Sequence, residues 1–260
     1  MSIKSIFRSF LPTRARSAAR DFLWRLLGIK WTMRSGLPVE LHGLSDWIVY
    51  SDIFVNGEYD EAIEHAYSTL PAGEQARILD LGANTGFFAM RCLDLAKRRG
   101  IGWDRLDLTL IEGSAAVFEG LMARVGKWGE AGRVLHLKHG LAGQLGGAGT
   151  MESADLNCMN SVVTDEQSGG SRFRIDYLDL RPYFREHGNV QLLKCDIEGS
   201  ELMFLENYAP QLSSVASIVI ELHHDKCDTR RCMQILQEAG FSNRRMLREA
   251  PTFAVAFAWR

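Results

Sequence analysis

A glycine-rich turn follows an apolar, strand-like segment and leads directly into a helix-like segment. It is formed by Asp80-Leu81-Gly82-Ala83-Asn84-Thr85-Gly86. Glycines at such a turn let the backbone approach a ligand closely, and the start of the following helix offers unpaired N–H groups. In an open α/β sheet, ligands bind beyond the carboxyl ends of the strands. We therefore expect a ligand site here, with Asp80, Gly82, Ala83, Asn84 and Gly86 as contact residues.

Two acids indicate what this ligand is. Gly82 and Gly86 are separated by three residues, which is not the Gly-x-Gly-x-x-Gly spacing of dinucleotide sites. Asp80 would repel a pyrophosphate but attract the ammonium and sulfonium groups of S-adenosylmethionine, directly or through a water. Glu112 ends the next strand-like segment, where its two oxygens can accept both ribose hydroxyls. Together these residues predict S-adenosylmethionine as the cofactor.

Two further residues complete the predicted cofactor site. Gly140 lies in the segment His139-Gly140-Leu141, where the adenine ring would lie, although a surface loop fits this segment nearly as well. Tyr59 precedes the sheet, in a segment expected to fold back over the cofactor. Its hydroxyl can bind the donor's carboxylate, and a packed ring with a solvated hydroxyl is the alternative.

The surrounding segments alternate between strand and helix patterns, which predicts a parallel sheet with helices on both faces. The expected strands are 77–81, 106–112, 133–137, 190–196 and 217–222. The first helix should be closed by residues 98–100, Ser114 should cap the second, and Asp228 or Thr229 should cap the last, which ends at Gly240. Residues 243–248 and 253–259 predict an antiparallel hairpin. The expected fold class is therefore α/β, a doubly wound, Rossmann-like sheet of the class I methyltransferase type.

One domain over residues 45–260 is expected, preceded by an extension over residues 1–44. The first thirty residues are basic and amphipathic, and Pro12 interrupts the pattern. We favour a helix that packs on the domain, and a weak peripheral contact of residues 1–30 with an anionic membrane is the alternative. The Gly- and Ser-rich stretch 143–171 predicts a long loop that contains short strands.

The bulk composition disfavours several classes of protein. The 30 basic and 32 acidic residues nearly cancel, so nothing favours a nucleic acid as the partner. No apolar run approaches the roughly 20 residues of a membrane span, and no secretion signal is present, so a cytoplasmic protein is expected. The five cysteines are scattered without zinc spacing and predict reduced thiols.

The fourth and fifth strand-like segments are specific enough to indicate a family. The run Leu193-Lys194-Cys195-Asp196-Ile197-Glu198-Gly199-Ser200-Glu201, followed by Ile220-Glu221-Leu222-His223, resembles the FkbM-type methyltransferases. The resemblance covers residues 45–225 and includes Ser51-Asp52-Ile53-Phe54-Val55, Glu58-Tyr59-Asp60 and Tyr177-Leu178-Asp179. Cys195 departs from the apolar residue that the family usually has there. The resemblance implies S-adenosylmethionine as the donor and, usually, a hydroxyl acceptor on a sugar, glycan or polyketide-like natural product.

An alcohol acceptor must lose its hydroxyl proton as the bond to the methyl group forms, which calls for a carboxylate, an imidazole or a metal. Asp196 ends the fourth expected strand, and Glu221 with His223 ends the fifth, so all three should face the methyl group. Asp196 or His223 is the expected general base. Lys194, paired with one of the carboxylates, is the alternative account of the same charges.

Two further acids open the helix after the fourth strand. Glu198 lies directly before Gly199 in the strand-to-helix turn and is expected to face the same crevice. Glu201 lies three residues later, where favourable contact with the helix macrodipole explains it as well. These acids and the imidazole can also hold a divalent metal, but no spacing specifies one, and no metal is predicted.

The function expected from these residues is O-methylation of a hydroxyl on a sugar, glycan or other natural product. Methylation of nitrogen or carbon is an alternative that makes a dedicated base less necessary. A module that binds the donor without turnover is a second alternative, and a nicotinamide oxidoreductase is disfavoured by the glycine spacing. The partner is then a small-molecule or glycan acceptor, and the sequence specifies no oligomeric state.

Overall fold

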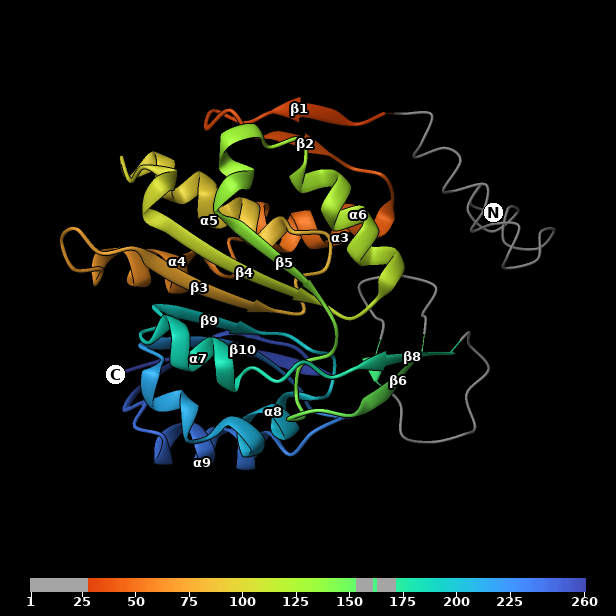
Figure 1. The fold of residues 1–260 in the computed structure, drawn as a ribbon, viewed down its shortest axis with the longest axis vertical. Coiled ribbons are helices and arrows are strands. Elements are labelled where there is room, and N and C mark those ends of the chain that lie inside the picture. Colours follow the sequence, from red (N-terminus) through yellow and green to blue (C-terminus); the bar gives the residue numbers. More distant parts are fainter. Residues whose placement is uncertain (1–27, 153–160, 163–171) are drawn as a thin grey trace, which may run out of the picture.

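The computed structural model describes residues 28–152, 161–162 and 172–260, and its centre is a seven-stranded sheet (Figure 1). The strand order is β11-β12-β10-β9-β3-β4-β5. Their bounds are β3 (Ala76–Leu81), β4 (Leu106–Glu112), β5 (Leu135–His139), β9 (Leu192–Cys195), β10 (Ser217–His223), β11 (Asn243–Glu249) and β12 (Phe253–Trp259). The first five are parallel, and β12 pairs antiparallel with both β10 and β11. This confirms the predicted doubly wound sheet with an antiparallel C-terminal hairpin.

Alternate residues of each strand supply two hydrophobic cores, one on each face of the sheet. Ile78 and Leu192 pack with three helices on one face, and Leu79 and Leu193 pack with three others on the opposite face. The first group is α4 (Asp60–Ser68), α5 (Phe87–Arg98) and α6 (Ala115–Val125). The second is α7 (Arg181–His187), α8 (Glu201–Tyr208) and α9 (Thr229–Glu238). Both faces are therefore covered, as a buried parallel sheet requires.

Several expected boundaries are confirmed and two are wrong. The third strand was expected at 133–137 but begins at Leu135, because a 3₁₀ helix, η3 (Gly129–Val134), occupies the preceding residues. The fourth is shorter than 190–196, and Val190 forms only an isolated bridge with Val215. Asp228 caps α9 as predicted by accepting a hydrogen bond from the backbone N–H of Arg231 (3.0 Å). Other short 3₁₀ helices are η2 (Trp103–Arg105) and η5 (Gln211–Ser214).

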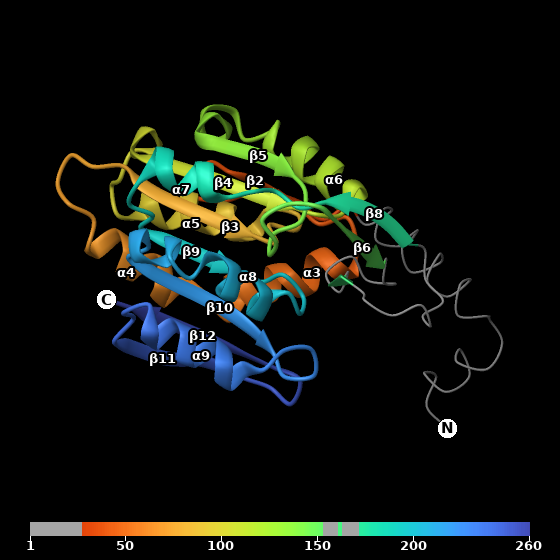
Figure 2. The ribbon, with the colours of Figure 1, turned by 60° about the horizontal axis from the view of Figure 1, so that its bottom comes forward.

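Short strands occur within the Gly- and Ser-rich stretch, as predicted. They are β6 (Ala148–Glu152) and β7 (Ser161–Val162), which pair antiparallel, and β6 also pairs with β8 (Arg172–Asp176). Figure 2 shows β6 and β8 beyond the edge of the main sheet toward which β3, β5 and β10 point. This small sheet therefore lies next to the carboxyl ends of the parallel strands.

The described part of the N-terminal region packs onto the domain. It contains β1 (Lys30–Thr32), β2 (Pro38–Glu40), α3 (Leu44–Tyr50) and the π-helix η1 (Ser51–Val55). Leu37, Val39 and Leu41 are buried in the first core. The basic amphipathic segment over residues 1–27 lies outside the described residues. Over the described ranges, no helix has the length and apolar character needed to cross a membrane.

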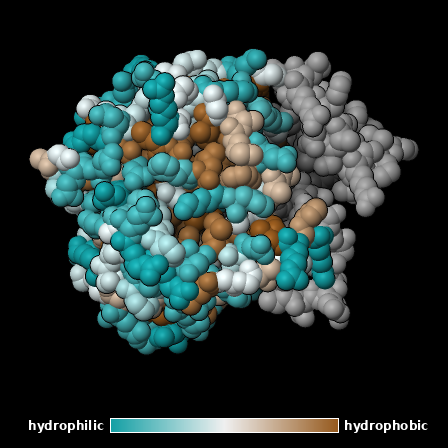
Figure 3. All heavy atoms as spheres, in the orientation of Figure 1, coloured by the Kyte–Doolittle hydropathy of each residue, from teal (hydrophilic) through white to brown (hydrophobic). Residues whose placement is uncertain are grey.

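Hydrophilic residues cover most of the face seen in Figure 1, and apolar atoms show mainly near its middle (Figure 3). Four of the cysteines, Cys92, Cys195, Cys227 and Cys232, are free, and Cys92, Cys195 and Cys232 are buried. These four agree with the prediction of unpaired thiols.

Arg124 of α6 ties the N-terminal region to the domain. Its guanidinium donates to Asp46 Oδ2 in α3 (2.9 Å) and to the carbonyl oxygen of Glu40 in β2 (2.8 Å). The same group lies over the ring of Phe87, 4.4 Å from its centroid. The side chains of Arg124 and Asp46 are only 8% and 9% exposed. A buried ion pair thus connects segments that are far apart in the sequence.

Replacing Asp46 by alanine should lower the free energy of unfolding by about 3–5 kcal/mol, because Arg124 then stays buried without a counter-charge. The exposed pair Arg231–Glu238, with side chains 40% and 55% exposed, is the matched control. Glu238→Ala should cost less than about 1 kcal/mol. Urea unfolding of the three proteins measures both effects, and equal losses would contradict the role given to Asp46.

Candidate active site

Two adjoining pockets lie at the carboxyl edge of the sheet, where the chain order reverses between β3 and β9. The β4-side pocket contains Glu112 at the end of β4 and Gly140 after β5. The β10-side pocket, of about 440 Å³, contains Glu221 and His223 of β10. Four residues line both pockets: Gly82, Asn84, Asp196 and Glu198. The structure therefore brings most of the predicted site residues around one bipartite cavity.

Gly82 allows the ends of β3 and β9 to approach each other. Its φ of +77° is in the left-handed region, and a Cβ added there would lie 1.7 Å from the carbonyl oxygen of Asp196. Asn84 also has a positive φ, +49°, and its side-chain oxygen accepts a hydrogen bond from the backbone N–H of Thr85 (2.7 Å). The turn is thus shaped by close backbone contact, as the glycine pattern predicted.

Glu112 holds two loops together and still has capacity for a ligand. Its Oε2 accepts a hydrogen bond from the backbone N–H of Asn84 (2.8 Å), and its Oε1 accepts one from that of Ser114 (2.7 Å). Burial raises the pKa of Glu112, and these two N–H donors oppose that rise. Each carboxylate oxygen can accept a second hydrogen bond. The geometry therefore fits the predicted contact with two ribose hydroxyls.

Lys194 occupies the centre of the site. Its ammonium donates to the carbonyl oxygen of Gly82 (2.9 Å) and lies 3.1 Å from Asp80 Oδ1 and 3.4 Å from Asp196 Oδ2. Burial alone would lower the pKa of Lys194, but the charges of Asp80 and Asp196 raise it above its ordinary value. The alternative raised from the sequence, a pairing of Lys194 with carboxylates, is what the structure shows.

Asp80 differs from its expected place in the pocket. Its side chain is fully buried beside Lys194 and lines neither pocket. Direct contact between Asp80 and the cofactor's ammonium or sulfonium is therefore not supported. Asp80 instead sets the position and charge of Lys194, which does line the β10-side pocket.

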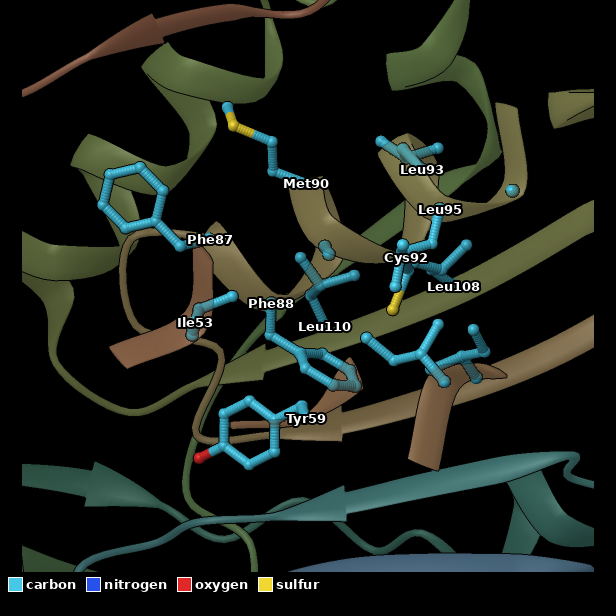
Figure 4. Packing of buried hydrophobic residues seen from close by; sticks show 14 of the residues in the cluster. Ile53, Tyr59, Phe87, Phe88, Met90, Cys92, Leu93, Leu95, Leu108 and Leu110 are labelled. Atoms are coloured by element: carbon cyan, nitrogen blue, oxygen red, sulfur yellow. The ribbon is translucent and has the colours of Figure 1, made fainter. Parts of the chain in front are cut away.

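The other predicted cofactor residues fall in different places. Gly140 lines the β4-side pocket, whereas Ala83 and Tyr59 line the β10-side pocket. Figure 4 shows Tyr59 beside Phe88, and the two rings meet edge to face with centroids 5.3 Å apart. Gly86 lines neither pocket, because it faces α6, where a Cβ would lie 2.7 Å from Leu121 Cδ1. Gly86 therefore packs closely on α6, and its contact with the cofactor stays a prediction.

His223 is surrounded by carboxylates. Its Nδ1 lies 3.0 Å from Glu201 Oε1, and its Nε2 lies 3.3 Å from Glu198 Oε2 and 3.5 Å from Glu221 Oε1. Burial would lower the pKa of His223, but the hydrogen bond and charge of Glu201, together with Glu198 and Asp196, raise it to about 9. The surrounding carboxylates therefore favour the protonated imidazole, which is poorly suited to act as the general base.

The neighbouring carboxylates are crowded as well. Burial and the negative charge of Asp196 raise the pKa of Glu221 to about 9. The same two causes raise the pKa of Glu198, whose carboxylate also accepts a hydrogen bond from Lys226 (2.9 Å). The β10 side of the site thus gathers more carboxyl groups than lysine and arginine side chains.

The C-terminal hairpin contributes to the site, although no sequence pattern indicated this. Arg248 of β11 lies 3.0 Å from Asp52 Oδ1 and donates to Glu58 Oε2 (2.8 Å), and all three line the β10-side pocket. Nothing in the local pattern of the hairpin distinguishes Arg248 from its neighbouring arginines. The contact depends on tertiary structure, because its partners lie before the sheet.

A family comparison agrees with this geometry. The sequence model described as "Methyltransferase FkbM domain" matches residues 80–242, which is more than half of the chain. The chain belongs to this family. The match begins at the acid of the glycine turn and includes Glu112, Asp196 and Glu221. This match confirms the predicted resemblance to the FkbM-type methyltransferases.

Solved structures agree with the family at the level of the fold. The FkbM methyltransferase of Methylobacillus flagellatus has a TM-score of 0.51 at 13% identity, over 94% of this chain and 59% of that chain. A structure of the METTL16 methyltransferase domain has a TM-score of 0.50 at 11% identity, over 100% of this chain and 96% of that chain. Fibrillarin of Aeropyrum pernix, with natively bound S-adenosyl-L-methionine, has a TM-score of 0.48 at 14% identity, over 89% and 82%. No curated protein matched the sequence.

The family and fold are those of S-adenosylmethionine-dependent methyltransferases with a class I sheet. This confirms the predicted cofactor and the coarse enzyme class. The residues fit the cofactor, because Glu112 has free acceptor capacity and Gly113 and Gly140 line the pocket beside it.

Glu112→Gln should weaken binding of S-adenosylhomocysteine at least about tenfold. The substituted amide places a donor against a backbone N–H, and a buried unsatisfied donor costs roughly 1–3 kcal/mol. Calorimetry measures the affinity, and Glu119→Gln on the exposed face of α6 is the control that should leave it unchanged. Equal affinities for both variants would remove Glu112 from the cofactor site.

Gly82→Ala should lower the free energy of unfolding by more than the matched variant Gly100→Ala. Both glycines have a similar φ, +77° and +74°, so both variants bear the roughly 1–2 kcal/mol of a left-handed residue with a Cβ. Only Gly82 also meets another backbone atom, whereas nothing lies within 4 Å of a Cβ at Gly100. Thermal and urea unfolding measure the difference. Similar losses would show that β3 and β9 separate easily at this point.

Proposed function

We propose that this methyltransferase transfers the methyl group of S-adenosylmethionine to a hydroxyl group of a sugar, glycan or related natural product. The observation that carries the proposal is the position of Asp196, which lines both pockets and therefore lies where the two ligands would meet. A carboxylate at that place suits an acceptor that must lose a proton.

The two pockets differ in ways that suit two ligands. Glu112 and Gly140 of the β4-side pocket match the demands of a ribose and an adenine, and this side takes the nucleoside of the donor. The β10-side pocket, with its mixture of charged groups and the rings of Tyr59 and Phe88, takes the acceptor. Aromatic faces together with many hydrogen-bonding groups suit a polyhydroxylated molecule.

S-adenosylmethionine supplies a methyl carbon on a sulfonium, whose C–S bond breaks toward sulfur while the acceptor oxygen forms the new C–O bond. The chain's own part is to align the hydroxyl with that carbon and to provide for its proton. Asp196, with 26% of its side chain exposed, is open to the cavity and can accept this proton. The ammonium group of Lys194, on the buried side of Asp196, holds this carboxylate in place through an ion pair.

His223 is assigned an orienting role in this proposal. Both of its ring nitrogens face carboxylate oxygens, so neither has a free lone pair directed at an acceptor. Glu198 and Glu221 flank the same ring and line the acceptor side. These three residues therefore shape the charge around Asp196, and they do not need to exchange a proton with the acceptor directly.

Asp196→Asn should reduce methyl transfer by about 100-fold or more, in keeping with the usual contribution of a positioned acid or base. Binding of S-adenosylhomocysteine, measured by calorimetry, should be retained, because the ribose and adenine contacts are assigned to Glu112 and Gly140. Asp104→Asn, an exposed acid at the amino end of the sheet, is the control and should keep full activity. Full turnover by Asp196→Asn would remove this residue from the mechanism.

The acceptor class is tested with labelled S-adenosylmethionine and a panel of glycans, monosaccharides and hydroxylated natural products. The proposal expects label in an ether linkage that survives mild acid and base. Label transferred only to amines or carbon would favour the N- or C-methyltransferase alternative. Donor binding without transfer to any member of a broad panel would favour a binding module.

A further inference from the structure

We infer that Asp196, Glu221 and His223 form a binding site for one divalent metal cation at the junction of the two pockets. One ligand atom from each of the three residues lies within 4.8 Å of the other two, which a cation can bridge with small side-chain movements. Asp196 and Glu221 come from the ends of adjacent parallel strands, and His223 follows Glu221 by two positions on the same strand face. The backbone of the sheet therefore fixes the spacing of the three groups.

The orientation of His223 is that of a metal ligand with a supporting carboxylate. Its Nδ1 is paired with Glu201, whose side chain is fully buried. Glu201 Oε1 also accepts hydrogen bonds from the backbone N–H groups of Gly199 (2.9 Å) and Ile197 (3.3 Å). A histidine that binds a metal almost always donates its other N–H to such an acceptor. This arrangement directs Nε2 toward Glu198 and Glu221, where the cation is inferred to bind in place of the Nε2 proton.

A second, independent observation comes from Glu58. Its side chain is 4% exposed and lines the same pocket, and its Oε2 accepts a hydrogen bond from Arg248. Its Oε1 is buried without a hydrogen-bond partner. A buried carboxylate oxygen without a hydrogen bond is unfavourable. A water molecule bound to a nearby cation would donate the missing hydrogen bond.

The balance of charge in the pocket favours a cation as well. Three side chains that line the β10-side pocket are lysine or arginine: Lys194, Lys226 and Arg248. Five partly buried side chains of the same pocket are carboxyl groups: Asp52, Glu58, Asp196, Glu198 and Glu221. Asp225 is exposed, so water and salt screen its charge. Carboxylates held this close repel one another, and a divalent cation relieves the repulsion while bridging them.

The donor set indicates the kind of cation. Carboxylate and water ligands suit Mg²⁺ and Mn²⁺, whereas imidazole suits Zn²⁺ and other transition metals. The inferred site has two carboxylates and one imidazole, and its remaining coordination positions are open to the cavity. Mn²⁺ is therefore the best single probe. Because Asp196 and Glu221 are 26% and 17% exposed, open positions remain for water or an acceptor hydroxyl.

The catalytic part of this inference rests on the proposed O-methylation, whereas the binding of the cation does not. A cation held here would lower the pKa of an acceptor hydroxyl bound to it, and the second carboxylate oxygen of Asp196 would remain to accept the proton. The acceptor oxygen would form the C–O bond as the C–S bond of the donor breaks, with the electron pair going to sulfur. Asp196 would then serve both as a ligand of the cation and as the acceptor of the proton.

The test is a titration of the full chain with Mn²⁺ alone. Binding is measured as the loss of the electron paramagnetic resonance signal of free Mn²⁺. The chain should bind one Mn²⁺. Glu221→Gln and His223→Gln should each weaken binding more than about tenfold, and Glu201→Gln should weaken it roughly 10–100-fold through His223. Asp225→Asn, an exposed acid of the same pocket outside the ligand set, should bind Mn²⁺ as the original chain does.

Calorimetry with S-adenosylhomocysteine identifies variants that have lost the fold, because the nucleoside contacts lie on the β4 side. The inference is overturned if the original chain saturably binds neither Mn²⁺ nor, in a parallel titration, Zn²⁺. It is also overturned if folded Glu221→Gln and His223→Gln bind as tightly as Asp225→Asn. If Zn²⁺ binds and Mn²⁺ does not, and if the binding of Zn²⁺ depends on the same residues, the inferred site is retained and its metal is Zn²⁺.

Methyl transfer is measured separately, so that failure of either proposal can be recognised. Chelation should abolish transfer to hydroxyl acceptors, and added Mn²⁺ or Mg²⁺ should restore it. Transfer that continues in chelator, by a chain that binds no cation, removes the metal and leaves the proposed O-methylation intact. Cation binding without transfer to any hydroxyl removes the proposed O-methylation and leaves the metal site intact.

Discussion

The buried ammonium of Lys194 is the interaction on which the rest of the site depends. It connects three groups that belong to two neighbouring strands: the carbonyl oxygen of Gly82, the carboxylate of Asp80 and that of Asp196. Without this charge, two carboxylates at the ends of β3 and β9 would repel each other in a buried place. The lysine therefore allows the glycine turn and the carboxylate of Asp196 to lie together where the sheet reverses its order.

The remaining charges extend outward from this centre in two directions. Toward β4, Glu112 uses backbone N–H groups of both adjoining loops, so its carboxylate is held without a basic side chain. Toward β10, carboxylates outnumber cationic side chains, and His223 makes contacts with Glu198, Glu201 and Glu221. In the β4 half of the cavity, backbone N–H groups thus stabilise the buried carboxylate. In the β10 half, carboxyl groups outnumber lysine and arginine side chains, which favours the binding of a cation.

Local sequence patterns predicted the strands, the hairpin, the glycine turn and the edge of the sheet at which the acids gather. These features depend on short-range periodicity and on the rule that parallel strands end together. Three residues whose surroundings the local pattern did not indicate depend on longer-range contacts. Asp80 is covered by Lys194 from another strand, Gly86 packs on α6, and Arg248 meets acids that lie before the sheet. Each of these partners is remote in the sequence, so no local pattern could have indicated it.

The same division separates the central strands of the site from its periphery. Asp196, Glu221 and His223 come from strand ends or the residue next to one, which central parallel pairing holds rigidly. Other walls of the β10-side pocket come from η1, the segment before α4 and the edge strand β11, joined by Arg248. Substitutions in these peripheral segments can change the pocket while the pairing of β3, β9 and β10 is kept. The proposed methyl transfer therefore depends on the strand ends, and the proposal assigns the choice of acceptor to the peripheral segments.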